Sequence, residues 1–141
     1  MNESHCVFFL VEDNRADADL IRRVLLKNDP AMRIEIARDG EEALTRLRDW
    51  DGQFPRPMIV LLDLKLPKIN GLQVLQAIKQ DEHLRILPVI VLTSSNQTDD
   101  IHQAYRWGAN SYIVKAIDFD EFSSAINTIY RYWCQLNVHP E

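Results

Sequence analysis

The chain alternates short apolar runs with longer amphipathic segments. The unbroken apolar run at residues 6–11 (CVFFLV) predicts a strand buried on both faces of a sheet, because successive side chains of a strand point to opposite sides. Further apolar strands are expected at residues 58–62, 89–92 and 111–114. The alternating segment at residues 33–37 (RIEIA) favours a fifth strand, at the edge of the sheet.

Amphipathic helices are expected after each of these strands. Residues 15–27 carry apolar side chains at helical spacing, and Asn14 is in position to cap that helix. Four more helices are expected, one after Gly40 and the others over residues 71–80, 98–107 and 118–136. A strand–helix alternation repeated five times predicts one α/β domain, with a parallel sheet covered by helices on both faces.

Composition narrows the class of protein. The 141 residues fit one domain, and 16 Lys+Arg against 21 Asp+Glu give a net charge of −5. That balance argues against a nucleic-acid partner, because phosphate binding needs clustered basic side chains. No apolar run approaches the roughly 20 residues of a membrane span, and the opening MNESHC has no basic region. We therefore expect a soluble, cytoplasmic protein with no nucleic acid and no membrane as partner.

The two cysteines lie near opposite ends of the sequence, at Cys6 and Cys134. Neither belongs to a C-x-x-C pair, so neither a zinc site nor thioredoxin-like chemistry is indicated. We expect both to be small apolar side chains, buried or half-buried, because free cysteine is usually found inside proteins.

Polar side chains follow four of the five expected strands. Glu12 and Asp13 come after the first strand, Asp63 after the third, Thr93 after the fourth and Lys115 after the fifth. Because the carboxyl ends of parallel strands lie at one edge of the sheet, these side chains should meet there. Three clustered carboxylates repel one another unless a cation lies among them. Asp13, Asp63 and a backbone carbonyl from the loop after Asp63 therefore suit Mg²⁺.

The same side chains suit phosphoryl transfer. A carboxylate can act as the nucleophile and form an aspartyl phosphate, and Asp63 is the best candidate because it ends a buried strand. Lys115 would supply positive charge and Thr93 a hydroxyl donor to the phosphoryl oxygens, whose negative charge must be stabilised.

Taken in order, these motifs resemble the receiver domains of response regulators in two-component signalling. The resemblance rests on Glu12-Asp13-Asn14, on Asp63 with Leu66-Pro67 and Asn70-Gly71 after it, on Thr93-Ser94, and on Tyr112 three residues before Lys115. It covers residues 5–136 as the receiver domain and leaves a short tail, residues 137–141. It implies an α/β, doubly wound, flavodoxin-like sheet with strand order 2-1-3-4-5 and five helices.

The resemblance implies a role for each matching residue. Asp63 would accept a phosphoryl group from a phosphohistidine on a sensor histidine kinase. Asp13, Asp63 and the main-chain carbonyl of Lys65 would hold Mg²⁺, and Glu12 would act through water. The protein would be a signalling phosphoacceptor and not an enzyme, since it would catalyse only its own phosphorylation and dephosphorylation.

Lys115 and Thr93 would bind the phosphoryl oxygens, and Thr93 and Tyr112 would form the switch pair. The Thr93 hydroxyl would move inward on phosphorylation and the Tyr112 ring would follow. One position departs from the family, which usually has a proline after the lysine, joined by a cis peptide bond. This chain has Ala116 there. A cis bond before a non-proline residue costs about 2.5–4 kcal/mol, so we expect the Lys115–Ala116 bond to be trans.

The resemblance implies a stand-alone receiver with no output domain, because a DNA-binding domain would need a further ~60–100 residues. Its output would be a protein contact. Eight aromatic residues lie between positions 105 and 133. In the last helix, core spacing is followed by Phe119, Phe122, Ile126, Ile129 and Trp133.

Two interpretations of the remaining aromatic residues stay open. They are either part of the core, with an exposed tyrosine or two, or an interface for a second copy of the chain. That homodimer would form through the fourth helix, the fifth strand and the last helix. Its interface residues would be Tyr105, Trp107, Tyr130 and Tyr132.

A narrower resemblance is to the small receivers that serve bacterial phytochrome sensor kinases. It rests on DLKLPK at residues 63–68, on the loop DGQFPRP at 51–57, and on Tyr132, Trp133, Asn137 and Pro140. It implies that the kinase partner is a light sensor and that the receiver is a homodimer.

Three other functions share part of this residue pattern. A Mg²⁺-dependent phosphatase of the haloacid-dehalogenase type needs a second Asp two residues after the nucleophile, where this chain has Lys65. A docking module that works without phosphorylation is disfavoured by the intact Asp13, Asp63, Thr93 and Lys115. A phosphorelay intermediate, which passes its phosphoryl group to another histidine protein, shares the chemistry and is not separated by the sequence from a receiver that binds an effector.

Overall fold

Five parallel strands form the central sheet of the computed structural model, which describes residues 6–49 and 57–140. The strands are β1 (Val7–Val11), β2 (Arg33–Ala37), β3 (Ile59–Leu62), β4 (Val89–Thr93) and β5 (Ser111–Val114). Their order is β2-β1-β3-β4-β5, and every neighbouring pair is parallel. The predicted fold class and strand order are therefore confirmed.

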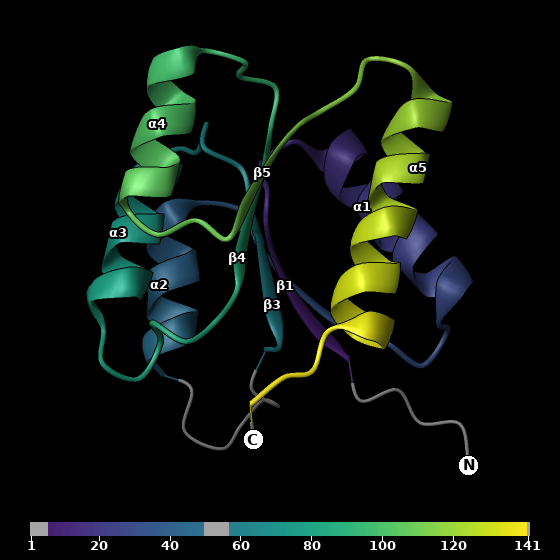
Figure 1. Cartoon of the computed structure of the whole chain (residues 1–141), viewed down its shortest axis with the longest axis horizontal. Helices are drawn as coiled ribbons and strands as arrows, with labels where there is room; N and C mark the ends of the chain where they lie inside the picture. The colour runs from purple at the N-terminus through teal and green to yellow at the C-terminus, as the bar shows by residue number, and fades with distance from the viewer. Residues whose placement is uncertain (1–5, 50–56, 141) are drawn as a thin grey trace.

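Helices cover both faces of this sheet. They are α1 (Arg15–Asn28), α2 (Gly40–Arg48), α3 (Gly71–Gln80), α4 (Thr98–Arg106) and α5 (Phe119–Tyr130), followed by a π-helical segment, η1 (Arg131–Leu136). Figure 1 shows α2, α3 and α4 on one side of the sheet and α1 and α5 on the other. Alternation along β1 accounts for the two layers, since Phe9 packs with α2–α4 whereas Phe8 packs with α1 and α5.

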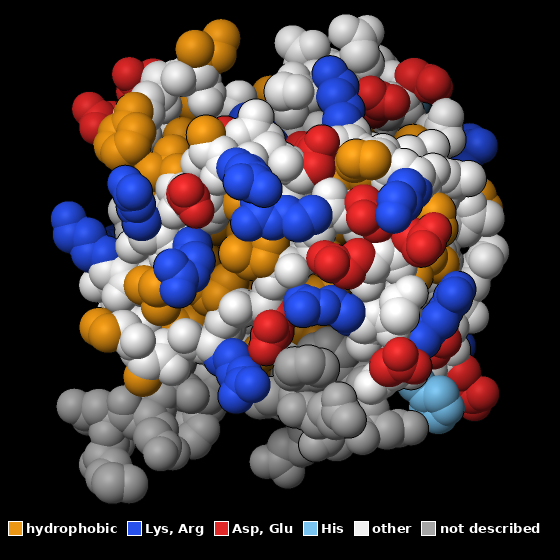
Figure 2. Space-filling model, turned by 180° about the vertical axis from the view of Figure 1, so that it is seen from behind, with side chains coloured by type: hydrophobic (Ala, Val, Ile, Leu, Met, Phe, Trp, Pro, Cys, Tyr) orange, Lys and Arg blue, Asp and Glu red, His pale blue; other side chains and the backbone are white. Residues whose placement is uncertain are grey.

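The carboxyl ends of the strands lie at the top of Figure 1, and the C-terminal tail lies at the bottom. β2 is an edge strand, as predicted. Its Glu35 pairs with Arg33 at 3.4 Å and with Arg46 at 3.9 Å. Figure 2 shows the molecule from behind, where basic and acidic side chains are mixed across the surface.

Side-chain caps fix the starts of α1 and α3 at the carboxyl edge of the sheet. Asn14 caps α1, as predicted, and Asn70 caps α3 in a reciprocal capping box with Gln73. Gly71 lies so close to the end of β3 that a Cβ there would be 2.3 Å from the backbone oxygen of Asp63. Only glycine fits this approach, so the start of α3 is packed directly against the residue that ends β3.

The two cysteines form a disulfide, contrary to the expectation of two separate apolar side chains. Cys6 and Cys134 are joined across a sequence separation of 128 residues, with their Cα atoms 5.7 Å apart. The sequence spacing carried no sign of this pairing, because the two residues come together only when η1 packs beside the start of β1. Disulfides are rare in reducing compartments, and the cytoplasmic location stays a prediction.

The last helix also differs from its prediction. The single helix expected over residues 118–136 is an α-helix to Tyr130 and a π-helix from Arg131. Phe119, placed in the core by spacing, is 64% exposed and is the first residue of α5. Phe122, Ile126 and Ile129 are buried as predicted.

The backbone of the described residues agrees with two expectations. These contain no cis peptide bond, so the trans Lys115–Ala116 bond is confirmed. Gly108, expected to end the fourth helix, has φ of +98° and directly follows Trp107, the C-cap of α4. The loop expected at residues 51–57 falls, except for Pro57, outside the described residues. None of the helices of the described residues is long and apolar enough to cross a membrane.

Candidate functional site: an acidic cluster with one lysine

Three carboxylates meet at the carboxyl edge of the sheet, as the sequence predicted. Glu12 and Asp13 directly follow β1, and Asp63 directly follows β3. These two strands are neighbours in register, so one ligand oxygen from each acid lies within 4.8 Å of the others. Glu12 and Asp63 are buried, whereas Asp13 is exposed. The cluster is open to solvent on the Asp13 side.

One lysine neutralises part of this charge. Nζ of Lys115 lies 2.6 Å from Oε1 of Glu12 and 3.0 Å from Oδ2 of Asp63. The lysine reaches the site because β5 ends at Val114, and its backbone N–H donates to the Thr93 carbonyl at 2.7 Å. The ammonium is itself almost fully buried, at 8% exposure of the side chain.

A fourth carboxylate, Asp17, was missed by the sequence analysis. Its Oδ2 accepts a hydrogen bond from Lys115 Nζ at 2.8 Å. Asp17 lies in the first turn of α1, where an acidic residue ordinarily complements the helix dipole, so its sequence position alone did not mark it. The signal was its spacing, since it lies one helical turn beyond Asp13 and α1 begins at the same sheet edge.

Burial and the lysine set the ionisation of the acids. Burial raises the pKa of Glu12 to about 7, although its hydrogen bond to Lys115 acts in the opposite direction. Burial would also raise the pKa of Asp63, but the Lys115 ammonium outweighs it and holds the pKa below its usual value. Burial would lower the pKa of Lys115, but its hydrogen bonds to Asp17 and Glu12 raise it above its ordinary value. Asp63 is therefore ionised, and so is the lysine.

The hydroxyl of Thr93 is available to a ligand. Thr93 ends β4 and is fully buried, and within the described residues its Oγ1 is a buried side-chain atom that has no hydrogen-bond partner. A buried hydroxyl without a partner is costly, so such a group in a native fold calls for an explanation. A ligand with oxygen acceptors at this edge of the sheet would satisfy it.

The predicted switch residue Tyr112 is directed toward the β4–α4 loop. It lies on β5, is half-buried, and donates its hydroxyl hydrogen to the backbone oxygen of Ser95 at 2.9 Å. Burial raises the pKa of its phenol. Ser95 in turn donates to a carboxylate oxygen of Asp100 in α4. The ring is thus connected to the segment that directly follows Thr93.

The loop after β3 is held by Asp63 itself. The backbone N–H of Lys65 donates to Oδ1 of Asp63 at 3.1 Å, and the N–H of Gly71 donates to the carbonyl of Leu64 at 2.9 Å. Lys68 adopts a positive φ of 66°, which lets the loop turn before α3. The Lys65 side chain is exposed, and the role of its main-chain carbonyl as a metal ligand stays a prediction.

The aromatic residues proposed for an interface divide into two groups. Tyr105 and Tyr132 are 50% and 46% exposed. Trp107 is half-buried against the core, and Tyr130 is buried at 8% exposure. The structure thus leaves two exposed rings on α4 and η1, and the interface itself stays a prediction.

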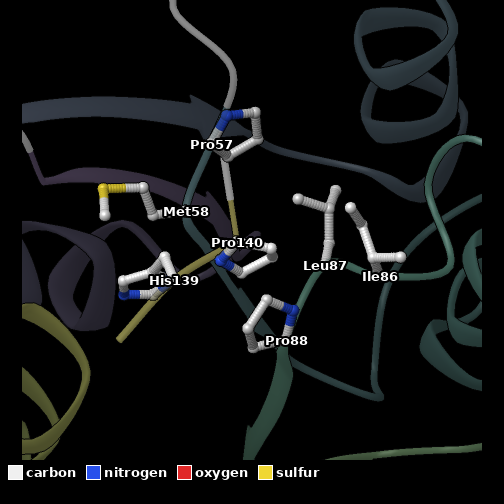
Figure 3. A pocket seen from close by; sticks show the side chains of 7 residues that line it. All are labelled: Pro57, Met58, Ile86, Leu87, Pro88, His139 and Pro140. Atoms are coloured by element: carbon white, nitrogen blue, oxygen red, sulfur yellow. The ribbon is translucent and has the colours of Figure 1, made fainter. Parts of the chain in front are cut away.

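An apolar pocket lies at the opposite edge of the sheet, away from the acidic cluster. Its volume is about 160 Å³, and Figure 3 shows its side chains, among them Met58 before β3, Pro88 before β4, and His139 and Pro140 of the tail. It contains no acidic residue among its lining side chains, so it takes no part in the chemistry of the cluster.

The donor set of the cluster fits a hard divalent cation. Glu12, Asp13 and Asp63 supply oxygen atoms only, which are the ligands that Mg²⁺ prefers, and the exposed side of Asp13 leaves room for bound water. Lys115 alone cannot balance the charge of the surrounding carboxylates. A cation beside the acids, and an oxyanion between Lys115 and Thr93, would complete the site.

Comparisons with known proteins agree on one family. The family model of the response regulator receiver domain matches residues 8–127. The chain is 42% identical over 139 residues to the probable methanogenesis regulatory protein FilR2 of Methanothrix harundinacea, a match that covers 98% of this chain and 90% of FilR2. The crystal structure of the phosphorylated cyanobacterial phytochrome response regulator RcpA superposes with a TM-score of 0.92 at 36% identity, covering 98% of this chain and 100% of RcpA. The Mn²⁺-bound form of the response regulator Rcp1 gives a TM-score of 0.87 at 34% identity, covering 96% of this chain and 99% of Rcp1.

Proposed function

Because the chain belongs to the response regulator receiver domain family, we propose that it accepts a phosphoryl group on Asp63 from a sensor histidine kinase and signals by protein contact. The observation that carries this proposal is the setting of the Asp63 carboxylate. It is ionised and bonded to a buried ammonium, and the neighbouring strand β4 ends in a buried threonine hydroxyl that lacks a partner.

Each residue around Asp63 has a separate role in the phosphoryl transfer. A carboxylate oxygen of Asp63 attacks phosphorus, a P–O bond forms, the P–N bond of the phosphohistidine breaks, and its electron pair stays on the imidazole nitrogen. Lys115 and Thr93 bind the phosphoryl oxygens as charge develops on them. Asp13, Asp63 and the carbonyl of Lys65 would hold Mg²⁺, with Glu12 acting through water. When bound, Mg²⁺ neutralises negative charge on the phosphoryl group.

We assign the output to the face formed by α4, β5 and α5. Tyr112 lies on β5, and its hydroxyl group donates a hydrogen bond to the loop after Thr93. A movement of Thr93 toward a phosphoryl group would therefore shift this hydrogen bond and the Tyr112 ring. Exposed Tyr105 and Tyr132 then offer contact surface to a second copy of the chain. Residues 5–136 act as the receiver, and residues 137–141 form a tail.

The kinase that we propose is of the phytochrome type. RcpA is described as a phytochrome response regulator, whereas FilR2 is described as a probable methanogenesis regulatory protein, so the relatives point to two kinds of pathway. The closing residues Tyr132, Trp133, Asn137 and Pro140 favour the first. Phosphotransfer from a radiolabelled phytochrome kinase, compared with an unrelated histidine kinase, tests the choice. Faster labelling by the unrelated kinase would contradict it.

The test of the phosphoacceptor uses acetyl phosphate and Mg²⁺, with phosphate-affinity gels and light scattering after size exclusion. We expect a shifted band in the wild type and no shifted band in Asp63→Asn. Asp19→Asn, which neutralises an exposed acid of α1, should give the same shifted band as the wild type. A rise in mass on phosphorylation would support association as the output. A shifted band that persists in Asp63→Asn would refute the assignment, and a constant dimer would remove dimerisation as the switch.

A further inference from the structure

The Lys115 ammonium is bound by three carboxylates, one of which has no part in the proposed transfer. Its distances are 2.6 Å to Glu12, 2.8 Å to Asp17 and 3.0 Å to Asp63. An ammonium group has three N–H donors, so these bonds use all of them. A phosphoryl oxygen on Asp63 can therefore take an N–H of Lys115 only if one of these bonds is given up.

Apart from the acceptor Asp63 itself, the two remaining partners differ in how readily they can release the lysine. Glu12 is 1% exposed, and a buried carboxylate that loses its partner pays a large desolvation cost. Asp17 is 27% exposed, so water can replace the ammonium there. Asp17 also lies outside the cluster of Glu12, Asp13 and Asp63, whose oxygens lie within 4.8 Å of one another. Its contact with Lys115 is thus separate from the predicted metal ligands.

Building on the proposed phosphorylation of Asp63, we propose that Asp17 is a positioning residue that holds Lys115 in the resting state and competes with the phosphoryl group for its ammonium. The side chain suits this role because α1 fixes it. The backbone N–H of Asp17 donates to the Asn14 cap at 3.0 Å, while its carboxylate reaches across to the residue after β5. Lys115 leaves Asp17 when phosphoryl oxygens become available, and Glu12 continues to hold it.

The first test compares Asp17→Asn with Asp19→Asn, which removes the same charge from an exposed position on the same helix. Lys115 keeps two carboxylate partners in Asp17→Asn and is freer to bind an oxyanion. The hydrogen bond that Lys115 no longer has to give up is worth about fivefold in rate, by the usual net contribution of one such bond. We expect acetyl phosphate to label Asp17→Asn about fivefold faster than wild type, and Asp19→Asn to match the wild type.

The affinity for beryllofluoride, a phosphoryl analogue, should rise in the same variant. Mg²⁺ affinity measured without a phosphoryl analogue should fall slightly or stay constant, because losing a negative charge cannot strengthen cation binding. A rise in beryllofluoride affinity without a rise in Mg²⁺ affinity separates release of the lysine from a general rearrangement of the site. Slower labelling of Asp17→Asn, or equal acceleration in Asp19→Asn, would overturn the proposal.

A double-mutant cycle shows whether Asp17 acts through Lys115. In a Lys115→Met background, Asp17→Asn should change the labelling rate less than twofold. An acceleration that persists without the lysine would assign the effect to the field of Asp17 alone and refute the positioning role.

Failure of the proposed function is distinguishable from failure of this inference. Loss of labelling in the wild type would count against phosphorylation of Asp63, and labelling with no effect of Asp17 would count against the competition alone. Urea unfolding of the wild type, Asp17→Asn, Lys115→Met and the double variant measures the Asp17–Lys115 coupling without any phosphoryl donor. No coupling there would refute the contact on which the inference depends.

Discussion

Removing the Cys6–Cys134 disulfide should lower the stability of the fold by several kcal/mol. The bond closes a loop of 128 residues, nearly the whole chain. In the chain-entropy model, opening a loop of that length releases about 5 kcal/mol of constraint on the unfolded state at 25 °C, and measured losses are about 2–5 kcal/mol. Since the net stability of a domain is about 5–15 kcal/mol, the change is large.

The assay is urea unfolding followed by circular dichroism, with and without a dithiol reductant. With a urea dependence of about 1–3 kcal/mol per molar, we expect the midpoint of Cys134→Ser to fall by about 1–3 M. The reductant should shift the wild type to the same midpoint and leave Cys134→Ser unchanged. Cys6→Ser/Cys134→Ser is the matched control, and it should behave as the single variant does. Identical midpoints for oxidised wild type and Cys134→Ser, or two titratable thiols in the native wild type, would refute the reasoning.

Two further predictions concern the acidic cluster. Because burial raises the pKa of folded Glu12 to about 7, Glu12 takes up a proton on folding between about pH 4.5 and 7, and stability falls as pH rises through that window. In EDTA, the urea midpoint of the wild type should therefore be lower at pH 8 than at pH 5, and the difference should be smaller for Glu12→Gln. An equal difference in the two proteins would contradict the assignment of this pH dependence to Glu12. Gly71→Ala should lose about 1–3 kcal/mol and label more slowly at Asp63, because its Cβ would be 2.3 Å from the Asp63 backbone oxygen. Thermal unfolding and the phosphate-affinity gel check this, and an unchanged melting temperature would show that the backbone yields.

The acidic cluster was predictable because the topology of the fold creates it. Residues that end parallel strands must meet at one edge, so Asp13, Asp63 and Lys115 could be placed without any side-chain coordinates. Apolar periodicity likewise predicted the order of strands and helices along the chain. Only the family resemblance, and not periodicity, supplied the order of strands across the sheet.

What escaped prediction depends on contacts between segments that are distant in sequence. The pairing of Cys6 with Cys134 requires the end of the last helix to pack beside β1, and no local pattern reports that. Asp17 needed the direction of α1 relative to β5. Phe119 had core spacing but is the first residue of α5, and its side chain is exposed. Spacing predicts which face of a helix is apolar, but it does not predict whether another element covers the whole length of that face.

The covalent bond between β1 and η1 gives the last helix a fixed end. In Figure 1, α5 descends from the carboxyl edge of the sheet to the opposite edge. Cys134 belongs to η1, which follows α5 in the chain. The Cα atoms of Cys6 and Cys134 are held 5.7 Å apart, so α5 cannot slide along the sheet as a rigid rod. The movement that remains open to α5 is a rotation about its fixed end at Cys134. A rigid movement of α5 would therefore be largest at Phe119 and smallest near Tyr130.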